Sequence, residues 1–118
     1  MTDVKTSWDQ HAALQSVDGD RELLAEMAEL FLQDSSRLLD EIGQAIQARN
    51  AGGLHRSAHT LKGSVANFAA GDARETAFQL EMMGRSGDLT GAPARYTALV
   101  EEIHRVEADL AEFARATV

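Results

Sequence analysis

Apolar residues recur at three- and four-residue steps between Leu54 and Phe68, and this stretch constrains the fold more than any other part of the chain. A period of 3.6 residues per turn places them on one face of a helix: Leu54, Ala58, Leu61, Val65 and Phe68. The opposite face then carries Gly52, His55, His59, Lys62, Gly63 and Ala66. We therefore predict an amphipathic helix from about Gly53 to Ala69 that buries its apolar face against other helices.

His59 points to solvent in this arrangement, and two of its neighbours on the helix surface are informative. Lys62 follows three residues later and Gly63 four residues later. These spacings place side chains next to each other on a helix. A glycine inside a helix costs about 0.5–1 kcal/mol relative to alanine. We therefore expect the surface around His59 to be kept open for another molecule.

This pattern resembles the motif of the histidine-containing phosphotransfer (HPt) domains of phosphorelays. The family signature is His-x-Leu-Lys-Gly-Ser followed by small residues and an asparagine, and it is matched by His59, Leu61, Lys62, Gly63, Ser64, Ala66 and Asn67. Similarity extends over residues 19–24 and 30–31 upstream and over residues 80–81 and 84–88 downstream. The chain departs from the family at Ala69, where a glycine usually ends the helix, and we expect Gly71 to end it instead.

The resemblance implies roles for the matched residues. His59 is the implied phosphorylation site, and a neutral imidazole is a nucleophile near neutral pH. Lys62 would place an ammonium beside the phosphoryl oxygens, and Gly63 would let the backbone of a partner approach. The implied docking surface also includes Arg56, His55, Ala66, Glu81 and Arg85, and the structural residues of the motif are Leu61, Ser64 and Asn67. An ordinary ion pair between Glu81 and Arg85, and a solvated charge at Arg56, are equal alternatives.

The distribution of charge favours an anionic group or an acidic partner near His59. The net charge is −8, yet none of the 19 acidic residues lies between Ile42 and Gly71, a stretch that carries Arg49, Arg56 and Lys62. The overall charge argues against general nucleic-acid binding, which needs a basic surface. The sequence contains no cysteine, so disulfides and thiol chemistry are excluded.

The length and the hydropathy pattern indicate one domain outside the membrane. We assign residues 1–118 to a single domain, with residues 1–6 as an unstructured lead. No apolar run approaches the roughly 20 residues needed to span a bilayer. Residues 1–20 lack the basic start and the apolar block of a signal peptide. We therefore expect a cytoplasmic protein without membrane contact.

The remaining segments predict further helices on both sides of the His59 helix. Ser7 or Thr6 is expected to cap a short helix over about residues 8–15 that covers one end of the domain. An apolar stripe then fits one long helix over about residues 20–49, or two helices joined by a kink at residues 34–36. The segment Asn50-Ala51-Gly52-Gly53 is expected to be a helix stop followed by a turn.

Two helices are predicted beyond the His59 helix. Asp72 and Glu75 have the spacing of a capping box, and the helix that follows is expected to end near Gly84. Pro93 is tolerated in the first turn of the last helix, whose apolar stripe continues to Phe113. No segment alternates with period two. We therefore predict an all-α fold, an antiparallel up-and-down four-helix bundle with a short additional N-terminal helix.

The leading functional hypothesis is a phosphocarrier that relays a phosphoryl group between receiver-domain aspartates and His59 in a two-component phosphorelay. The resemblance implies a response-regulator receiver domain, a hybrid histidine kinase or both as partners, with Mg²⁺ supplied by the receiver. The resemblance implies that the domain supplies only the nucleophile and a docking surface, and we therefore expect a monomer that holds no cofactor and is not an enzyme by itself. No phosphate-binding glycine loop of the usual kinds is present, so nothing indicates a nucleotide site.

Two alternatives remain open at this point. One is the phosphoacceptor domain of a chemotaxis-type histidine kinase, and the other is a non-catalytic helical adaptor. The chain is equally compatible with a free-standing protein and with a piece of a hybrid kinase. His55 and His59 have a spacing that can hold a metal, but no third ligand is evident in the sequence, and we expect no metal site.

Overall fold

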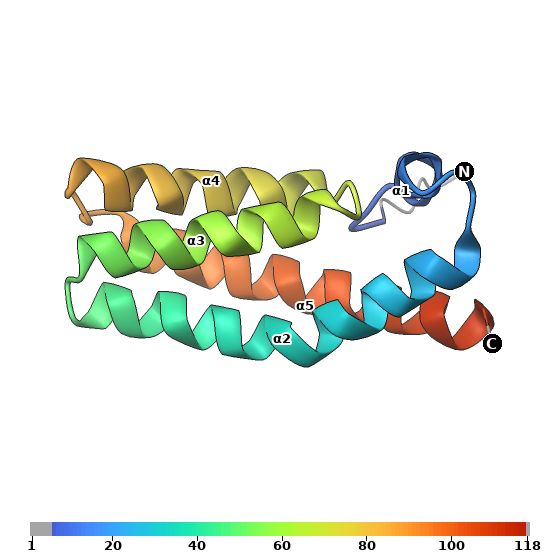
Figure 1. The fold of residues 1–118 in the computed structure, drawn as a ribbon. Helices are drawn as coiled ribbons and strands as arrows, with labels where there is room; N and C mark the ends of the chain where they lie inside the picture. Colours follow the sequence, from blue (N-terminus) through green and yellow to red (C-terminus); the bar gives the residue numbers. More distant parts are fainter. Residues whose placement is uncertain (1–5, 118) are drawn as a thin grey trace, which may run out of the picture.

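The computed structural model describes residues 6–117, and all regular elements in this range are helices. Four long helices pack side by side and a short one lies across one end of them (Figure 1). The helices are α1 (Gln10–Ser16), α2 (Arg21–Gln47), α3 (Ala51–Ala66), α4 (Gly71–Ser86) and α5 (Ala92–Thr117). The predicted four-helix bundle with an additional N-terminal helix is confirmed. The lead expected over residues 1–6 lies outside the described residues, except for Thr6.

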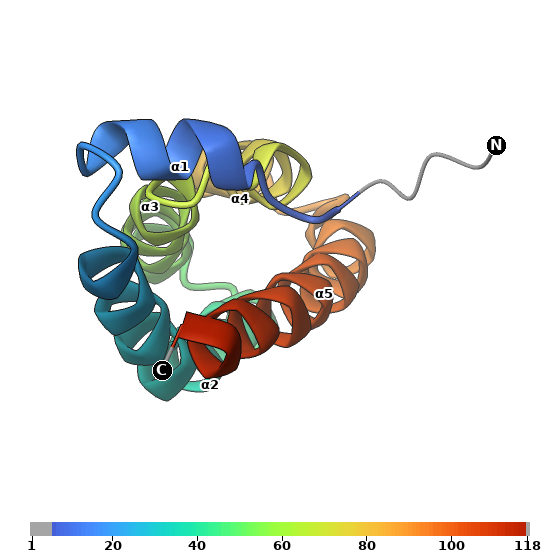
Figure 2. The same cartoon turned by 90° about the vertical axis from the view of Figure 1, so that its right-hand side faces the viewer.

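Successive long helices run in opposite directions and form a closed ring of neighbours (Figures 1 and 2). The contacts join α2 to α3, α3 to α4, α4 to α5, and α5 back to α2. The apolar stripe predicted for the His59 helix is buried in the centre: Leu54, Ala58, Leu61, Val65 and Phe68. Each large apolar side chain buried in this way contributes about 1.5–3 kcal/mol. The opposite side of α3 therefore remains at the surface, with α2 and α4 on its flanks.

Helix α2 is continuous, which decides between the two predicted alternatives. The chain remains helical through residues 34–36, where a kink was considered. Ser35 is fully buried, and its hydroxyl donates a hydrogen bond to the carboxylate of Glu107 on α5. Because the hydroxyl of Ser35 has a hydrogen-bond partner, its burial leaves no polar group unpaired. The polar residues at 34–36 therefore do not interrupt the helix.

The N-terminal boundary of α3 differs from the prediction because Asn50 caps the helix. The side-chain oxygen of Asn50 accepts a hydrogen bond from the backbone N–H of Gly53 at 2.9 Å. Residues 51–53 therefore form the first helical turn and not a loop before it. The turn between α2 and α3 lies one step earlier, where Arg49 has a φ of +55°.

The C-terminal boundary of α3 was also predicted wrongly. The helix ends at Ala66, and the chain reverses through Ala69, which has a left-handed φ of +51°. An L-residue pays a steric cost in this region, whereas glycine does not. Ala69 itself therefore makes the reversal, and Gly71, which was expected to end the helix, is the first residue of α4.

Helix α4 starts before the predicted capping box and ends after the predicted stop. Its N-cap is Ala70, which makes no side-chain capping bond, so Asp72 and Glu75 do not form the capping box. The helix continues past Gly84 to Ser86 and ends with Gly87 at a φ of +84°. Glycine at this position is the usual way to terminate a helix. Gly84 must therefore serve another purpose.

Helix α1 covers the end of the bundle at which α3 turns into α4 (Figure 2). It is capped by Asp9, whose carboxylate accepts the backbone N–H of Ala12 at 3.1 Å, and not by Ser7 or Thr6 as predicted. Trp8 is buried against Phe68 and Phe113. Across residues 6–117, the helices lack the combination of length and apolar character that a membrane span requires.

Candidate functional site

Gly84 allows α4 to pack closely against the first half of α3. A Cβ atom at this position would lie 2.5 Å from the backbone nitrogen of His55 and 2.7 Å from the carbonyl oxygen of Ala51. Backbone atoms cannot yield to such a contact, so only glycine fits there without a shift of the helix. One turn earlier on α4, this close packing places Glu81 against the surface of α3.

The carboxylate of Glu81 is the point at which the site converges. Its Oε2 lies 2.9 Å from Nδ1 of His59, and its Oε1 lies 2.8 Å from Nζ of Lys62. His55 also faces it, with Nε2 at 3.8 Å from Oε2. The side chain of Glu81 is only 10% exposed, whereas that of His59 is 64% exposed. Glu81 thus joins three side chains of α3 from beneath the surface.

Glu81 is ionised, and this fixes the proton on His59. Burial raises the pKa of its carboxyl, but the hydrogen bonds from Lys62 and His59 outweigh this effect and hold the pKa below its ordinary value. An ionised carboxylate can only accept hydrogen bonds. Nδ1 of His59 must therefore be the donor, and in the neutral form of the ring the free lone pair then lies on Nε2.

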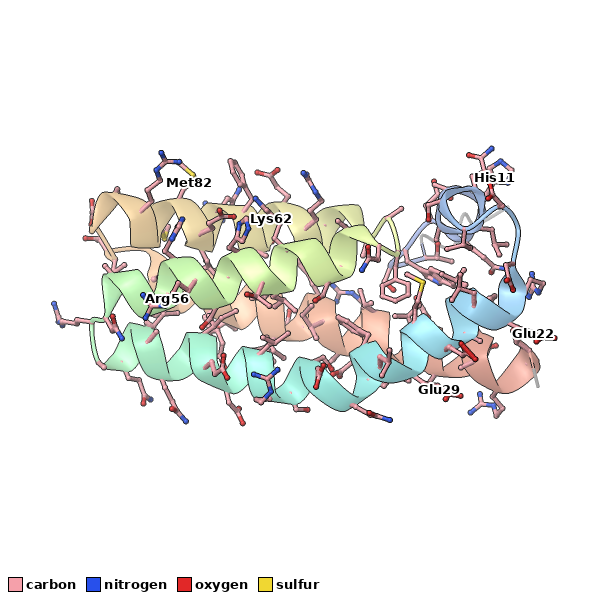
Figure 3. All side chains as sticks on the ribbon, viewed as in Figure 1. His11, Glu22, Glu29, Arg56, Lys62 and Met82 are labelled. Atoms are coloured by element: carbon pink, nitrogen blue, oxygen red, sulfur yellow. The ribbon has the colours of Figure 1, made fainter. Side chains whose placement is uncertain are left out.

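Lys62 is less exposed than the sequence pattern predicted. Its side chain is 20% exposed, since its ammonium contacts the carboxylate of Glu81 and lies 5.2 Å from the ring centroid of Phe78. Figure 3 shows Lys62 on the edge of α3 that faces α4. Two residues of α4 therefore hold a positive charge beside His59.

His55 lies next to His59 on the same face of α3. The two rings are stacked, with centroids 6.4 Å apart and planes inclined by 26°. The carboxylate of Glu81 lies beside this pair of histidines, a position that the sequence alone did not establish for it. Even so, no group of three or more His, Cys, Asp or Glu side chains among residues 6–117 is arranged to hold a metal ion.

The other predicted docking residues lie apart from Glu81. Arg56 lines a groove with Glu41 and Gln44 of α2, on the opposite side of α3 from Lys62 (Figure 3). Arg85 is exposed, and in the part of the chain that the structure describes it forms no ion pair with Glu81. The predicted Glu81–Arg85 pair is therefore absent there, because Glu81 turns to α3.

Gly63 and Ala66 leave the surface beside His59 low and open. Both residues are exposed, and a Cβ atom added at Gly63 would meet nothing within 4 Å. The residues expected to be structural behave differently: Leu61 is fully buried, and the hydroxyl of Ser64 donates to the carbonyl of Thr60 at 3.2 Å. Asn67 is the C-cap of α3.

Two residues that shape the site were missed in the sequence. Phe78 was not considered, although an aromatic residue one turn before Glu81 on an amphipathic helix was a usable signal. Gly84 was interpreted as the end of a helix, and its contact with the backbone of His55 depends on how two helices pack. The stretch without acidic residues was correctly noted, but Glu81 enters the same surface from another helix.

An exposed imidazole with one nitrogen held as a donor and the other free is arranged as a nucleophile and not as a core histidine. Comparisons with known proteins address the family and the fold of the chain. The family model of the Hpt domain matches residues 26–109. The chain therefore belongs to the Hpt domain family, and it is a histidine phosphotransfer protein of a phosphorelay, with receiver domains and kinases as the kinds of partner.

The fold is also that of a solved relative. The crystal structure of histidine-containing phosphotransfer protein B (HptB) from Pseudomonas aeruginosa PAO1 matches with a TM-score of 0.87. The match covers 96% of this chain and 98% of that chain, at 23% sequence identity. A search of curated proteins found no significant match.

Proposed function

We propose that His59 carries the phosphoryl group and that Nε2 is the attacking atom. The observation that carries this proposal is the 2.9 Å contact between Nδ1 of His59 and Oε2 of Glu81. The lone pair of Nε2 attacks the phosphorus of an aspartyl phosphate on a receiver domain. The new P–N bond forms as the P–O bond breaks, and the aspartate leaves as a carboxylate.

Glu81 acts as a positioning residue in this step. The phosphorylated ring keeps the proton on Nδ1 and therefore carries a positive charge, which the carboxylate of Glu81 stabilises through its existing hydrogen bond. Lys62 contacts the other oxygen of the same carboxylate at 2.8 Å. Its ammonium is thus held within reach of the face on which the phosphoryl oxygens arrive, where it stabilises their charge.

The partner supplies the rest of the chemistry. We propose that this chain is a phosphocarrier and not an enzyme by itself, that it holds no cofactor, and that Mg²⁺ enters with the receiver domain. The net charge of −8 supports a protein partner over nucleic acid. We further propose that it acts as a monomer in the cytoplasm, in line with the absence of a membrane-spanning helix among residues 6–117.

The test is transfer from receiver domains that carry a labelled aspartyl phosphate. We expect the wild type to accept label in a bond that is acid-labile and alkali-stable, as a phosphoimidazole is. His59→Gln should accept none. His55→Gln and His104→Gln are the matched controls, and both should still accept it. Label on folded His59→Gln would refute the assignment.

A further inference from the structure

His55 faces the carboxylate of Glu81 together with His59 and Lys62 but stands farther from it. Its Nε2 lies 3.8 Å from Oε2 of Glu81, whereas His59 and Lys62 contact the same carboxylate at 2.9 and 2.8 Å. Because a carboxylate oxygen can accept two hydrogen bonds, Oε2 can take a second donor beside Nδ1 of His59. The side chain of His55 is 40% exposed, and an imidazole in contact with water can gain a proton near neutral pH. His55 can therefore change its charge within the site.

The ring of His55 lies next to the ring that receives the phosphoryl group. Side chains of a helix lean toward its N-terminus, so the ring of His59 leans over the turn that carries His55. The two ring centroids are 6.4 Å apart. A phosphoryl group bonded to His59 therefore adds its negative charge within about 8–10 Å of His55, which is the distance over which charges interact at physiological ionic strength.

Phosphorylation of His59 leaves the site short of one positive charge. Before transfer, the charges of Glu81 and Lys62 balance each other at 2.8 Å. A phosphoryl group brings about two negative charges, whereas its bond to Nε2 leaves only one positive charge on the ring of His59. A proton on His55 supplies the missing charge at a place where the carboxylate of Glu81 also stabilises it.

The charged groups around His55 come from α3 and α4. They are Arg56, His59 and Lys62 on α3 and Glu81 and Arg85 on α4. Arginine and lysine side chains keep their charge near neutral pH, and Glu81 stays ionised because its hydrogen bonds hold its pKa below the ordinary value. Helix α2 packs on the other flank of α3, where it meets Arg56. A change of charge near neutral pH therefore falls to the two histidines.

We propose that His55 is a positioning residue that takes up a proton from water when His59 is phosphorylated and so retains the phosphoryl group. The inference rests on the proposed function of His59. Protonation of His55 must favour phosphorylated His59 by the same factor by which phosphorylation favours protonated His55. The transfer equilibrium therefore shifts toward His59 as the pH falls through the range in which His55 gains its proton, and this effect disappears at higher pH.

The experiment measures the equilibrium constant for transfer from a phosphorylated receiver domain between about pH 5.5 and 8.5. This constant compares phosphorylated with free protein and does not depend on how tightly the receiver docks. His55→Gln removes the group that binds the proton, and His55→Lys replaces it with a permanent positive charge. His104→Gln is the matched control, because it removes an exposed histidine from α5.

The variants should separate at opposite ends of the pH range. His55→Gln should match the wild type at high pH and fall about threefold below it at low pH, since one charge about 8 Å away through a largely aqueous medium gives a factor of this size. His55→Lys should match the wild type at low pH and exceed it at high pH. His104→Gln should follow the wild type throughout.

A small phosphodonor tests the uptake of the proton without a receiver. In phosphoramidate the P–N bond breaks and ammonia leaves as the bond to Nε2 of His59 forms. Nitrogen NMR shifts of the His55 ring, recorded at one pH near neutrality before and after labelling, should move toward those of a protonated ring. His59→Gln treated in the same way should show no change.

Each remaining outcome decides the question. Equal pH dependence in His55→Gln and the wild type, or unchanged ring shifts of His55 after labelling, would overturn the proposal and leave the role of His59 intact. An equilibrium constant for His55→Lys as low as that of His55→Gln would overturn it as well, because the charge would then have no effect. Failure of the proposed function is a different result, because His59→Gln would then still accept label from phosphoramidate.

Discussion

Replacing Glu81 separates the two contacts that its carboxylate makes. Glu81→Ala removes the acceptor for Nδ1–H of His59 and the counter-charge of Lys62 together. Glu81→Gln keeps one carbonyl oxygen as an acceptor but removes the charge. Glu75→Ala is the matched control, because it removes one negative charge from an exposed position of the same helix, where its partner is Gln79. A difference between Glu81 and Glu75 therefore reports contact with His59 and Lys62.

The structure sets the size of the effect on stability. Glu81 is largely buried, and hydrogen bonds that involve a charged group contribute about 1.5–3 kcal/mol. His59 and Lys62 can both turn to water when Glu81 is lost, which reduces the cost. We therefore expect Glu81→Ala to lower the free energy of unfolding by about 1–2 kcal/mol, or the melting temperature by about 3–8 °C.

The pH dependence of this effect follows from the lowered pKa of Glu81. Burial raises the pKa, the bonds from Lys62 and His59 lower it by more, and the folded value lies below the ordinary value of 4.5. Stabilisation by a carboxyl of this kind is fully present above the unfolded pKa and is lost as the pH falls through the folded value. The difference in stability between the wild type and Glu81→Gln should be constant near neutral pH and shrink below pH 4.5.

The effect on phosphotransfer is read from the rate and from the position of the ring proton. Without Glu81 the proton can move to Nε2 and block the lone pair. If the preference of the proton for Nδ1 over Nε2 falls by about 1.4 kcal/mol, the ratio of the two tautomers changes tenfold. We therefore expect Glu81→Ala to slow transfer at saturating receiver about tenfold, and Glu81→Gln, which keeps one acceptor, about threefold. Nitrogen NMR shifts of the His59 ring identify the protonated nitrogen. Wild-type rates in Glu81→Ala, with the proton still on Nδ1, would refute the reasoning.

Three further predictions concern α3 and the turn after it. Gly63→Gln should leave the melting temperature unchanged or slightly raised, while the rate of phosphotransfer falls sharply. Its control, Gly84→Ala, should lower the free energy of unfolding by about 1–3 kcal/mol, because the added methyl group meets the backbone of α3. A lower melting temperature with normal transfer in Gly63→Gln would contradict the docking role. Lys62→Ala should lower the single-turnover rate at saturating receiver, and equal saturated rates at low and high salt would limit Lys62 to docking. Ala69→Gly should raise the free energy of unfolding by about 0.5–1 kcal/mol by relieving the positive φ, and thermal melting checks it.

The fold was predictable because the apolar periodicity is long and regular. The core stripe of α3 is buried as the spacing predicts, and the bundle follows from four such stripes joined by short loops. The errors lie at helix ends, where one side chain or one backbone angle decides. Asn50 lengthens α3 at its start by capping it, and Ala69 takes a conformation that its side chain disfavours. Periodicity carries no information about either.

The site was predictable only as far as it lies on one helix. His59, Lys62 and Gly63 could be placed together from their spacing on α3. Glu81 could not, because its position depends on how closely α4 approaches α3, and that distance is set by Gly84 against the backbone of His55. The packing of α4 against α3 also explains why the predicted ion pair between Glu81 and Arg85 does not form. Spacing on a single helix makes such a pair plausible, whereas packing turns Glu81 toward α3.

The shared carboxylate suits a residue that must both take up and release a phosphoryl group. Glu81 holds Lys62 near His59, and the same bond competes with phosphoryl oxygens for the ammonium of Lys62. A lysine without this competitor would bind the phosphoryl group more tightly and favour the phosphorylated histidine. In Glu81→Gln, the release of Lys62 favours phosphorylated His59, whereas the loss of the counter-charge of its ring disfavours it. Since the phosphoryl oxygens carry the larger charge, we expect the release of Lys62 to dominate, and the transfer equilibrium to shift toward phosphorylated His59 even as the forward step slows. A shift of the equilibrium toward the receiver would show instead that the carboxylate acts chiefly by stabilising the charged phosphoimidazole ring.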